Sequence, residues 1–541
     1  MIDYSKSRVL IVDDSQAMCS SLRITLSNFG ITRSESSNSA GEAIFRIRHR
    51  EFDMIVCDYN LGDSTDGQQL LEYVRREHLI QPSVVFLMVT AERSYEKVVL
   101  CAEMAPDDYL LKPFTAETMR VRLEKVFDKK AVFSTIYAHL AESRLAEAVE
   151  ECDRLLQAQS RYSVDLFRMK GELLLDLGRE EEAQQLYESL LSSRAIPWAR
   201  LGLAKAMRNS GNLDLAAEQL QVVIEEMPEY LAAYDVLAKV HEENGHPELA
   251  QESLANALRM SPGNLVRQSA LGQVAFRNGD LETATRAFSS VVDKGRYSFS
   301  RSHNDFVNLS RVQMENGEFA KALQSLNDAR SAFGTAPVVE LATSTMETLI
   351  HHAANNAAAS TAALDKAIAA RTEAGIDLAG QTAIDLAKGC FVNGRVDEGR
   401  QLVRDMVSNY YDDTMVKRSV RQMLDAVGRG DESKALIEDS VADVIKLNND
   451  GVLLARQGNL AGAIDLLLEA ARRMPQNVQL GLNAAQALIV ESDRTGWNEE
   501  HMREAQRLLG RHAAAHGDLP KFKKIRGYLK DVGLKFGVKV T

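Results

Sequence analysis

The chain has 541 residues, of which 45% are hydrophobic and 6% aromatic, and its formal net charge is −12. This length fits three or four domains, or one domain and an extended array, and the negative charge argues against a protein that coats nucleic acid, because such proteins neutralise phosphates with Lys and Arg. No apolar run approaches the roughly 18 residues that span a bilayer, and the first residues lack the hydrophobic core of a signal peptide. The five cysteines are scattered without C-x-x-C spacing. We therefore expect a cytoplasmic protein.

Short apolar runs alternate with helical periods over residues 1–128, which predicts a doubly wound α/β domain with a five-stranded parallel sheet. Continuous apolar runs are typical of strands that are buried on both faces. The expected strands are Arg8–Asp13, Thr32–Ser36, Met54–Asp58, Ser83–Thr90 and Asp108–Leu111. The expected helices are Gln16–Asn28, Ala40–Arg50, Gly67–Glu77, Tyr95–Met104 and Thr115–Phe127.

Polar residues gather at the carboxyl ends of these strands, where the site of a doubly wound sheet lies. Carboxylates that converge there need a cation, and oxygen ligands favour Mg²⁺. We expect Asp58 to attack a phosphoryl group as nucleophile, Lys112 to pair with a phosphoryl oxygen and the Thr90 hydroxyl to donate a hydrogen bond to another. Asp13 and Asp14 complete the acidic cluster.

The stretches VLIVDDS, VTA and YLLKPF, together with the strand that ends at Asp58, resemble the receiver domain of bacterial response regulators. The separations of 44 residues from Asp14 to Asp58 and 22 from Thr90 to Lys112 are those of the chemotaxis-type receiver. The resemblance implies a sensor histidine kinase or phosphotransfer protein as partner. It further implies the following residue roles: Asp14, Asp58 and the backbone carbonyl of Asn60 as metal ligands, Asp13 as the holder of a metal-bound water, and Tyr109 as the switch aromatic.

The loop from Asn60 to Gly67 departs from that family, because it is one residue longer and lacks the usual proline. We expect a reshaped loop with intact chemistry, in which Asp63 and Asp66 alter kinase selectivity. Asn60 and Glu92 occupy the positions that flank the hydrolytic water in the family, so their polar side chains predict a short-lived phosphoryl group. The alternative is a degenerate receiver that keeps the fold for binding alone.

Residues 129–332 repeat with a period near 34, because Gly recurs five residues before Ala and a small residue stands seven before the Gly. The pairs are Gly178/Ala183, Gly211/Ala216, Gly245/Ala250, Gly279/Ala284 and Gly317/Ala322. The small residues are Gly171, Ala204, Ala238 and Gly272, and Gly451 stands in the same place before Gly458 farther along the chain. This pattern resembles the tetratricopeptide repeat (TPR), a pair of antiparallel helices whose stacked copies form a protein-binding groove. The resemblance implies that each Gly lies in the turn between the two helices.

The repeat fades over residues 333–445, where Gly394/Gly399 and Gly430/Ala435 resemble degenerate copies. Residues 446–541 contain a good copy, Gly458/Ala463 with Pro475, and then a basic end. The spacing of Phe522, Ile525 and Leu529 predicts a capping helix with a solvated basic face, and a nucleic-acid patch is the alternative. His351-His352 lacks partners at metal spacing, and Trp198 and Trp497 are interpreted as packing residues.

Together these features predict a response regulator with protein-binding output and no DNA binding. It is expected to catalyse only its own phosphoryl transfer and dephosphorylation. Three alternatives remain open: a phosphate sink that the array merely localises, a peptide-sensing helical array, and an enzyme with an unrecognised site in residues 333–440.

Overall fold

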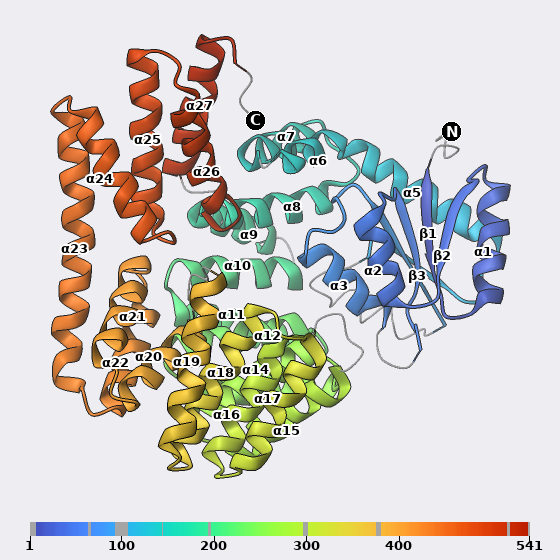
Figure 1. The fold of residues 1–541 in the computed structure, drawn as a ribbon. Coiled ribbons are helices and arrows are strands. Elements are labelled where there is room, and N and C mark those ends of the chain that lie inside the picture. The colour runs from blue at the N-terminus through green and yellow to red at the C-terminus, as the bar shows by residue number, and fades with distance from the viewer. Residues whose placement is uncertain are drawn as a thin grey trace. The chain divides into compact units, whose positions relative to one another are not determined.

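The computed structural model describes residues 7–62, 66–91, 106–142, 144–192, 196–295, 301–374, 380–516 and 520–538. The chain divides into two compact units, Met1–Asp305 and Phe306–Thr541, and each is described by itself. Figure 1 shows a strand-containing domain at the N-terminus and helices over the rest of the chain.

The first unit begins with a five-stranded parallel sheet in the order β2-β1-β3-β4-β5. The strands are β1 (Arg8–Val12), β2 (Arg33–Ser37), β3 (Met54–Asp58), β4 (Val85–Thr90) and β5 (Asp108–Leu111). The predicted fold class and all five strands are therefore confirmed, with end shifts of one or two residues. Strand β1 stops before Asp13, so this residue lies just beyond the strand end.

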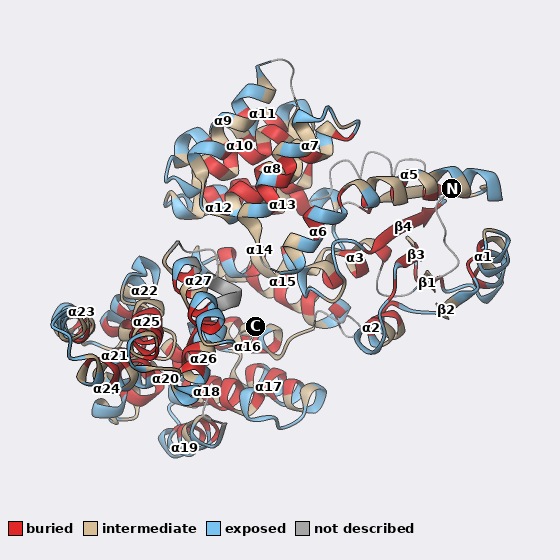
Figure 2. Ribbon diagram, turned by 90° about the horizontal axis from the view of Figure 1, so that it is seen from above, coloured by how far each residue is buried: buried red, intermediate tan, exposed pale blue. Residues whose placement is uncertain are grey.

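Helices cover both faces of the sheet, as expected for strands that are apolar throughout. The described helices of this domain are α1 (Gln16–Asn28), α2 (Ala40–His49), α3 (Gly67–Arg76) and α5 (Ala116–Val132). Helices α2 and α3 pack on one face and α1 and α5 on the other, and Figure 2 shows the buried residues on the strands. The helix expected at Tyr95–Met104 lies outside the described residues.

The helical array of the first unit follows α5 almost without a break. Its helices are α6 (Ser134–Ala141), α7 (Leu145–Gln157), α8 (Ser163–Asp176), α9 (Glu180–Leu191), α10 (Pro197–Asn209), α11 (Leu213–Glu226), α12 (Leu231–Glu243), α13 (Pro247–Met260), α14 (Leu265–Arg277) and α15 (Leu281–Lys294). The predicted turn glycines have positive φ, from +64° at Gly178 to +80° at Gly211. Gly272 lacks the Cβ that would lie 2.8 Å from the Phe288 ring, so the helices approach closely there.

The second unit continues the pattern with longer and less regular helices. These are α16 (His303–Glu315), which begins just before the unit boundary, α17 (Phe319–Phe333), α18 (Pro337–Ala353), α19 (Ala357–Ala374), α20 (Gly380–Val392), α21 (Val396–Asn409), α22 (Thr414–Ala426), α23 (Gly430–Arg456), α24 (Leu460–Arg473), α25 (Val478–Thr495), α26 (Glu499–His516) and α27 (Pro520–Lys535). The boundaries predicted at residues 128, 332 and 445 remain predictions.

Two turns differ from the expected glycine pattern. The turn between α18 and α19 uses Asn355, whose φ is +57°, so a regular helix pair is present where the glycine signal was missing. The turn before α23 uses Gly428 at φ +72°, whereas Gly430 begins that helix. The assignment of Gly430 as a turn glycine was therefore wrong, because the turn closes two residues earlier and Gly430 is already the first residue of the 27-residue helix α23.

The C-terminal helix α27 caps the second unit, as its apolar spacing predicted. Phe522, Ile525 and Leu529 are at most 3% exposed and belong to one core with α25 and α26. Two basic side chains are engaged with α25: Lys521 donates to Gln479 and Asn483, and Lys535 pairs with Asp493. These contacts favour the cap over a nucleic-acid patch.

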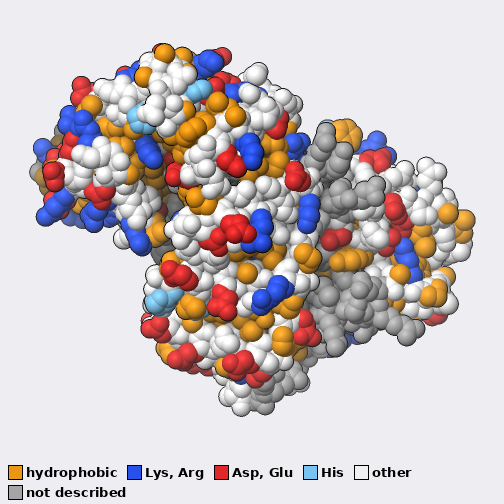
Figure 3. Space-filling view, turned by 90° about the horizontal axis from the view of Figure 1, so that it is seen from below, with side chains coloured by type: hydrophobic (Ala, Val, Ile, Leu, Met, Phe, Trp, Pro, Cys, Tyr) orange, Lys and Arg blue, Asp and Glu red, His pale blue; other side chains and the backbone are white. Residues whose placement is uncertain are grey.

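Acidic and basic side chains are interspersed on the face shown in Figure 3, with hydrophobic side chains in small groups between them. No helix among the described residues is long and apolar enough to cross a membrane. The described cysteines, Cys19, Cys57, Cys152 and Cys390, are free and buried.

Candidate functional site

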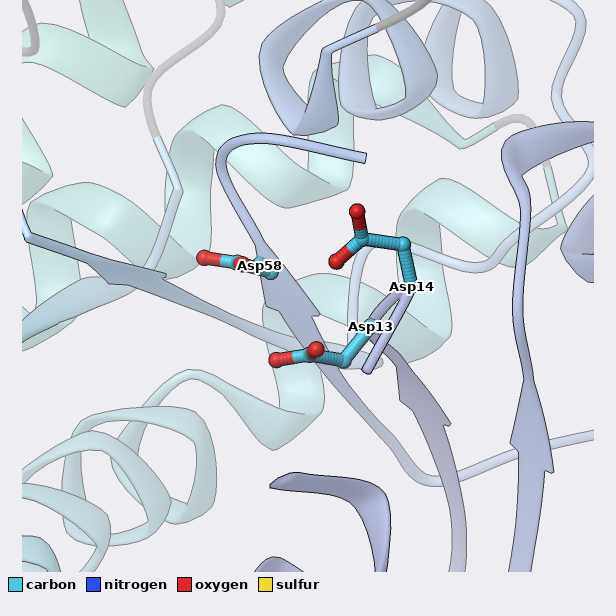
Figure 4. Close-up of side chains that lie close together, drawn as sticks. All are labelled: Asp13, Asp14 and Asp58. Carbon is cyan, nitrogen blue, oxygen red and sulfur yellow. The ribbon is translucent and has the colours of Figure 1, made fainter. Parts of the chain in front are cut away.

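Three aspartates meet at the carboxyl ends of neighbouring strands. Asp13 and Asp14 follow β1 and Asp58 ends β3, and β1 pairs directly with β3. One oxygen from each carboxylate lies within 4.8 Å of the other two, and Figure 4 shows the three side chains around a common space. This is the one such group of potential metal ligands in the described part of the chain.

Lys112 supplies the positive charge of this cluster. Its Nζ lies 3.0 Å from Oδ2 of Asp58 and 3.3 Å from Oδ2 of Asp13. Burial raises the pKa of Asp58, and although Lys112 opposes this effect the pKa remains above its usual value. Burial lowers the pKa of Lys112, but the hydrogen bond and charge of Asp58, with help from Asp13, leave it raised. Lys112 therefore stays protonated beside the carboxylate.

The backbone around Asp13 holds its carboxylate toward the cluster. Asp13 is 1% exposed, and its Oδ1 accepts the backbone N–H of Ser15 at 2.9 Å. Its own N–H donates to the carbonyl oxygen of Ser37 on β2 at 3.1 Å. A buried carboxylate with these partners has a defined position for either a cation or a bound water.

Thr90 and Tyr109 lie on adjoining strands beside the cluster. Thr90 is 2% exposed at the end of β4, and its carbonyl oxygen accepts the backbone N–H of Lys112 at 2.7 Å. Tyr109 on β5 is half-buried, and the Arg122 guanidinium lies 5.5 Å from the centroid of its ring. Arg122 also pairs with Asp108 at 3.0 Å. One side chain of α5 therefore contacts two neighbouring residues of β5, and one of them is Tyr109, the predicted switch aromatic.

The loop after Asp58 is anchored at both described ends. Asn60 and Asp66 form an antiparallel bridge, and the N–H of Gly67 donates to the carbonyl oxygen of Tyr59 at 2.7 Å. A Cβ on Gly67 would lie 2.4 Å from the carbonyl oxygen of Asp58, so only glycine lets α3 start this close to the nucleophile position. This requirement was not recognised from the sequence, although a Gly after an acidic turn residue is a visible hint.

Asp66 forms reciprocal hydrogen bonds with Gln69 at the start of α3. Its Oδ1 accepts the N–H of Gln69 at 2.7 Å, and its own N–H donates to Oε1 of Gln69. This reciprocal arrangement is a capping box at the start of α3, so Asp66 has a structural role, and its effect on kinase selectivity remains a prediction. Asp63 and Glu92 lie outside the described residues.

The donor set suits Mg²⁺. Three carboxylates provide oxygen ligands, which this ion prefers, and the cluster carries more negative charge than Lys112 can balance. Asp13, Asp14 and Asp58 would hold the ion. The carbonyl of Asn60 as a further ligand remains a prediction.

Among the other described residues there is no further group of acidic, histidine or cysteine side chains that could hold a metal ion. Nε2 of His351 lies 3.8 Å from a carboxylate oxygen of Glu347 on the same helix, a contact within one helix face. Trp198 packs edge-to-face on Tyr187 and Trp497 lies against Phe536, in agreement with their interpretation as packing residues.

A doubly wound parallel sheet with an acidic cluster and one lysine at its carboxyl edge defines the receiver class of domain, and comparisons with known proteins agree. A family model for the response regulator receiver domain matches residues 9–124. The chemotaxis protein CheY of Pseudomonas aeruginosa is 31% identical over 122 residues, which are 23% of this chain and 97% of that protein. A CheY-like receiver domain protein from Methanospirillum hungatei JF-1 is 28% identical over 23% of this chain and 96% of that structure, with a TM-score of 0.21.

The helical part matches a family model for the tetratricopeptide repeat at residues 168–230 and 236–300. The C-terminal part of a TPR repeat-containing protein from Cytophaga hutchinsonii is 15% identical and covers 46% of this chain and 100% of that structure, with a TM-score of 0.37. The chain belongs to the response-regulator receiver family through its first domain, and tetratricopeptide repeats follow that domain.

Proposed function

We propose that the chain is a two-component response regulator that takes a phosphoryl group on Asp58 and acts through protein binding by its helical repeats. The observation that carries this proposal is the position of Lys112 Nζ, 3.0 Å from Asp58 Oδ2 inside the acidic cluster. A lysine in this position can pair with a phosphoryl oxygen once the group is attached.

In the proposed reaction, a carboxylate oxygen of Asp58 attacks the phosphorus of a phosphohistidine on a sensor kinase or phosphotransfer protein. The new O–P bond forms as the P–N bond breaks, and the leaving imidazole nitrogen takes up a proton. Mg²⁺ bound at the cluster would supply positive charge opposite the phosphoryl oxygens. The chain has no other catalytic task in this proposal than its own phosphorylation and dephosphorylation.

The switch step of the proposal uses Thr90 and Tyr109. The Thr90 hydroxyl would move to donate to a phosphoryl oxygen, and Tyr109 would turn inward into the space that Thr90 vacates. The ring is now held beside Arg122, so its movement has to break or reshape that contact and thereby disturbs α5. Helix α5 continues into the first helix of the array, which gives the change a route to the repeats.

Phosphorylation is tested on the purified full chain with acetyl phosphate and Mg²⁺, with intact mass as the readout. We expect one added phosphoryl group, which Asp58→Asn and a chelator both abolish and which Asp53→Asn, a change at an exposed acid just before the start of β3, leaves in place. A phosphoryl group that persists for hours with Mg²⁺ would contradict the short lifetime predicted from Asn60 and Glu92. Equal labelling of the Asp58→Asn chain would place the acceptor elsewhere.

Protein-binding output is tested by affinity capture with the wild-type chain, Asp58→Asn and the wild-type chain with beryllofluoride. A partner captured unequally by the three forms supports phosphorylation-gated binding. Equal capture refutes the gating.

A further inference from the structure

A cavity of about 310 Å³ lies among α8, α10 and α12, the first helices of three successive helix pairs. Helix α10 contacts both α8 and α12, so the cavity is formed by neighbouring repeats of one unit. Its apolar lining consists of Leu175, Trp198, Leu201 and Val236, and its charged lining consists of Arg168, Glu172, Asp176, Lys205, Arg208 and Lys239. The lining therefore combines an apolar part with charged side chains, which suits a ligand that has both apolar and charged groups.

Tyr187 places a buried polar group in this cavity. Its side chain is 1% exposed and lines the cavity. A Cβ at Gly171 would lie 2.3 Å from its hydroxyl oxygen and one at Gly202 would lie 2.3 Å from its ring, so these two glycines make room for the phenol between α8 and α10. The hydroxyl has no hydrogen-bond partner among the described residues. Burial raises the pKa of Tyr187, which keeps the hydroxyl protonated and able to donate.

Positive charges around the cavity come from all three helices. Arg168 pairs with Glu172 at 3.3 Å, and Arg208 pairs with Glu243 at 2.6 Å, so the charges of these two arginines are already partly balanced. Lys239 on α12 is exposed and forms no ion pair with any residue that the structure describes. Lys205 on α10 also lines the cavity.

We propose that this cavity binds an extended acidic segment of a partner protein, with one carboxylate accepting a hydrogen bond from the Tyr187 hydroxyl and others facing Lys205 and Lys239. An apolar side chain of the segment would lie against Trp198. The inference rests on the proposed protein-binding function and names the chemistry of the partner.

The positions of the cations indicate whether the cavity binds an internal segment of the partner chain or only its terminal carboxylate. Packed helices lie about 8–10 Å apart, and an extended chain advances about 3.3 Å per residue. Carboxylates about three residues apart therefore match cations on successive helices, whereas one terminal carboxylate reaches a single helix. Glu172 and Asp176 interrupt the positive charge of the lining, so carboxylates spaced along a peptide fit it better than the unbroken row of phosphates of a nucleic acid.

The test measures fluorescence anisotropy on the unphosphorylated full chain. The probe is a fluorescein-labelled peptide that repeats Glu-Leu-Ser, and its control is the same peptide with Gln in place of Glu. Tyr187→Phe removes only the hydroxyl, and Lys239→Glu reverses one exposed charge. The matched control is Lys294→Glu, an exposed lysine on α15 outside the cavity lining.

We expect the Glu peptide to bind more tightly than the Gln peptide. Tyr187→Phe should weaken binding of the Glu peptide about tenfold, and Lys239→Glu should weaken it at least about threefold. Lys294→Glu should leave its binding unchanged. Equal weakening by the two charge reversals, no preference for the Glu peptide, or tighter Lys239-dependent binding of a single-stranded oligonucleotide would each overturn the proposal. Because Asp58 takes no part in this titration, its outcome is independent of the phosphorylation test.

Discussion

Nζ of Lys130 lies 2.8 Å from Oδ1 of Asp107, and each of the two side chains is only 9% exposed. Lys130 is near the end of α5, whereas Asp107 immediately precedes β5. The same ammonium group donates to the carbonyl oxygen of Pro82 at 2.6 Å and lies 5.1 Å from the centroid of the Tyr137 ring on α6. One buried cation therefore connects the edge of the receiver sheet to the first helix that follows the domain.

Substitution of Lys130 is expected to destabilise this junction strongly. In the Lys130→Met chain, the buried Asp107 carboxylate loses Lys130 and keeps its longer ion pair with Arg75 at 3.5 Å. Loss of one partner of a buried pair lowers the free energy of unfolding by on the order of 3 kcal/mol. The matched control is Lys129→Met, because Lys129 pairs with Asp165, whose side chain is 45% exposed, and such pairs contribute about 1 kcal/mol or less. Urea unfolding measures the free energy of unfolding of each variant, and hydrogen exchange measures the local opening of α5 and α6. Equal losses of stability in the two variants would refute the special role of Lys130.

The Asp58→Asn chain is expected to be more stable than the wild type at neutral pH without Mg²⁺. Because the pKa of Asp58 is raised in the folded chain, chiefly by burial, the folded state retains this proton to a higher pH than the unfolded state. The corresponding stability is present below the ordinary carboxyl pKa and is lost as pH rises through the raised value. The Asp58→Asn side chain does not ionise, so the variant does not lose this stability as the pH rises.

This difference should depend on pH in one direction. Thermal unfolding of both chains with a chelator should show a clear gain for Asp58→Asn at pH 7 and a smaller gain near pH 4. A gain that grows as pH falls would contradict the raised pKa. Addition of Mg²⁺ should stabilise the wild type more than the variant, because the variant lacks one carboxylate ligand.

Gly202→Ala is expected to disturb the packing between α8 and α10. The new Cβ would lie 2.3 Å from the Tyr187 ring, and overpacking of this kind costs typically about 1–3 kcal/mol. Gly510→Ala is the matched control, because nothing lies within 4 Å of its Cβ position in α26, and alanine there should stabilise by up to about 1 kcal/mol. Circular dichroism during thermal unfolding separates the two, and a stabilised Gly202→Ala chain would be inconsistent with the close approach.

Phe522→Ala is expected to loosen the C-terminal cap. The ring is 1% exposed within the core shared with α25 and α26, and truncation of such a ring costs about 3–5 kcal/mol. Hydrogen exchange should accelerate in α25, α26 and α27. Lys524→Ala, a change at an exposed residue of the same helix, should alter stability by less than about 0.5 kcal/mol. Comparable effects of both changes would argue against a cap built on Phe522.

The sequence alone was sufficient for the α/β domain because its signals are local. Apolar runs of strand length, acidic residues at their ends and a lysine after the last strand place the cluster of Asp13, Asp14, Asp58 and Lys112 at one sheet edge, since parallel strands share a carboxyl edge. The regular repeats were equally visible, because each turn between Gly178 and Gly317 needs a residue that tolerates positive φ.

Tertiary structure alone decided the features that depend on contacts between distant residues. Asn355 closes a turn where the sequence offered no glycine, and Gly428 closes the turn that the repeat pattern had placed at Gly430, since any residue that tolerates positive φ can close a turn. The predicted helix already began at Gly67, but the reciprocal hydrogen bonds with Gln69 that make Asp66 its cap appear only in the tertiary structure. Likewise, the junction of Lys130 with Asp107 and the Tyr187 hydroxyl in its cavity arise from side chains brought together by packing, and packing partners so far apart along the chain leave no periodic pattern in the sequence.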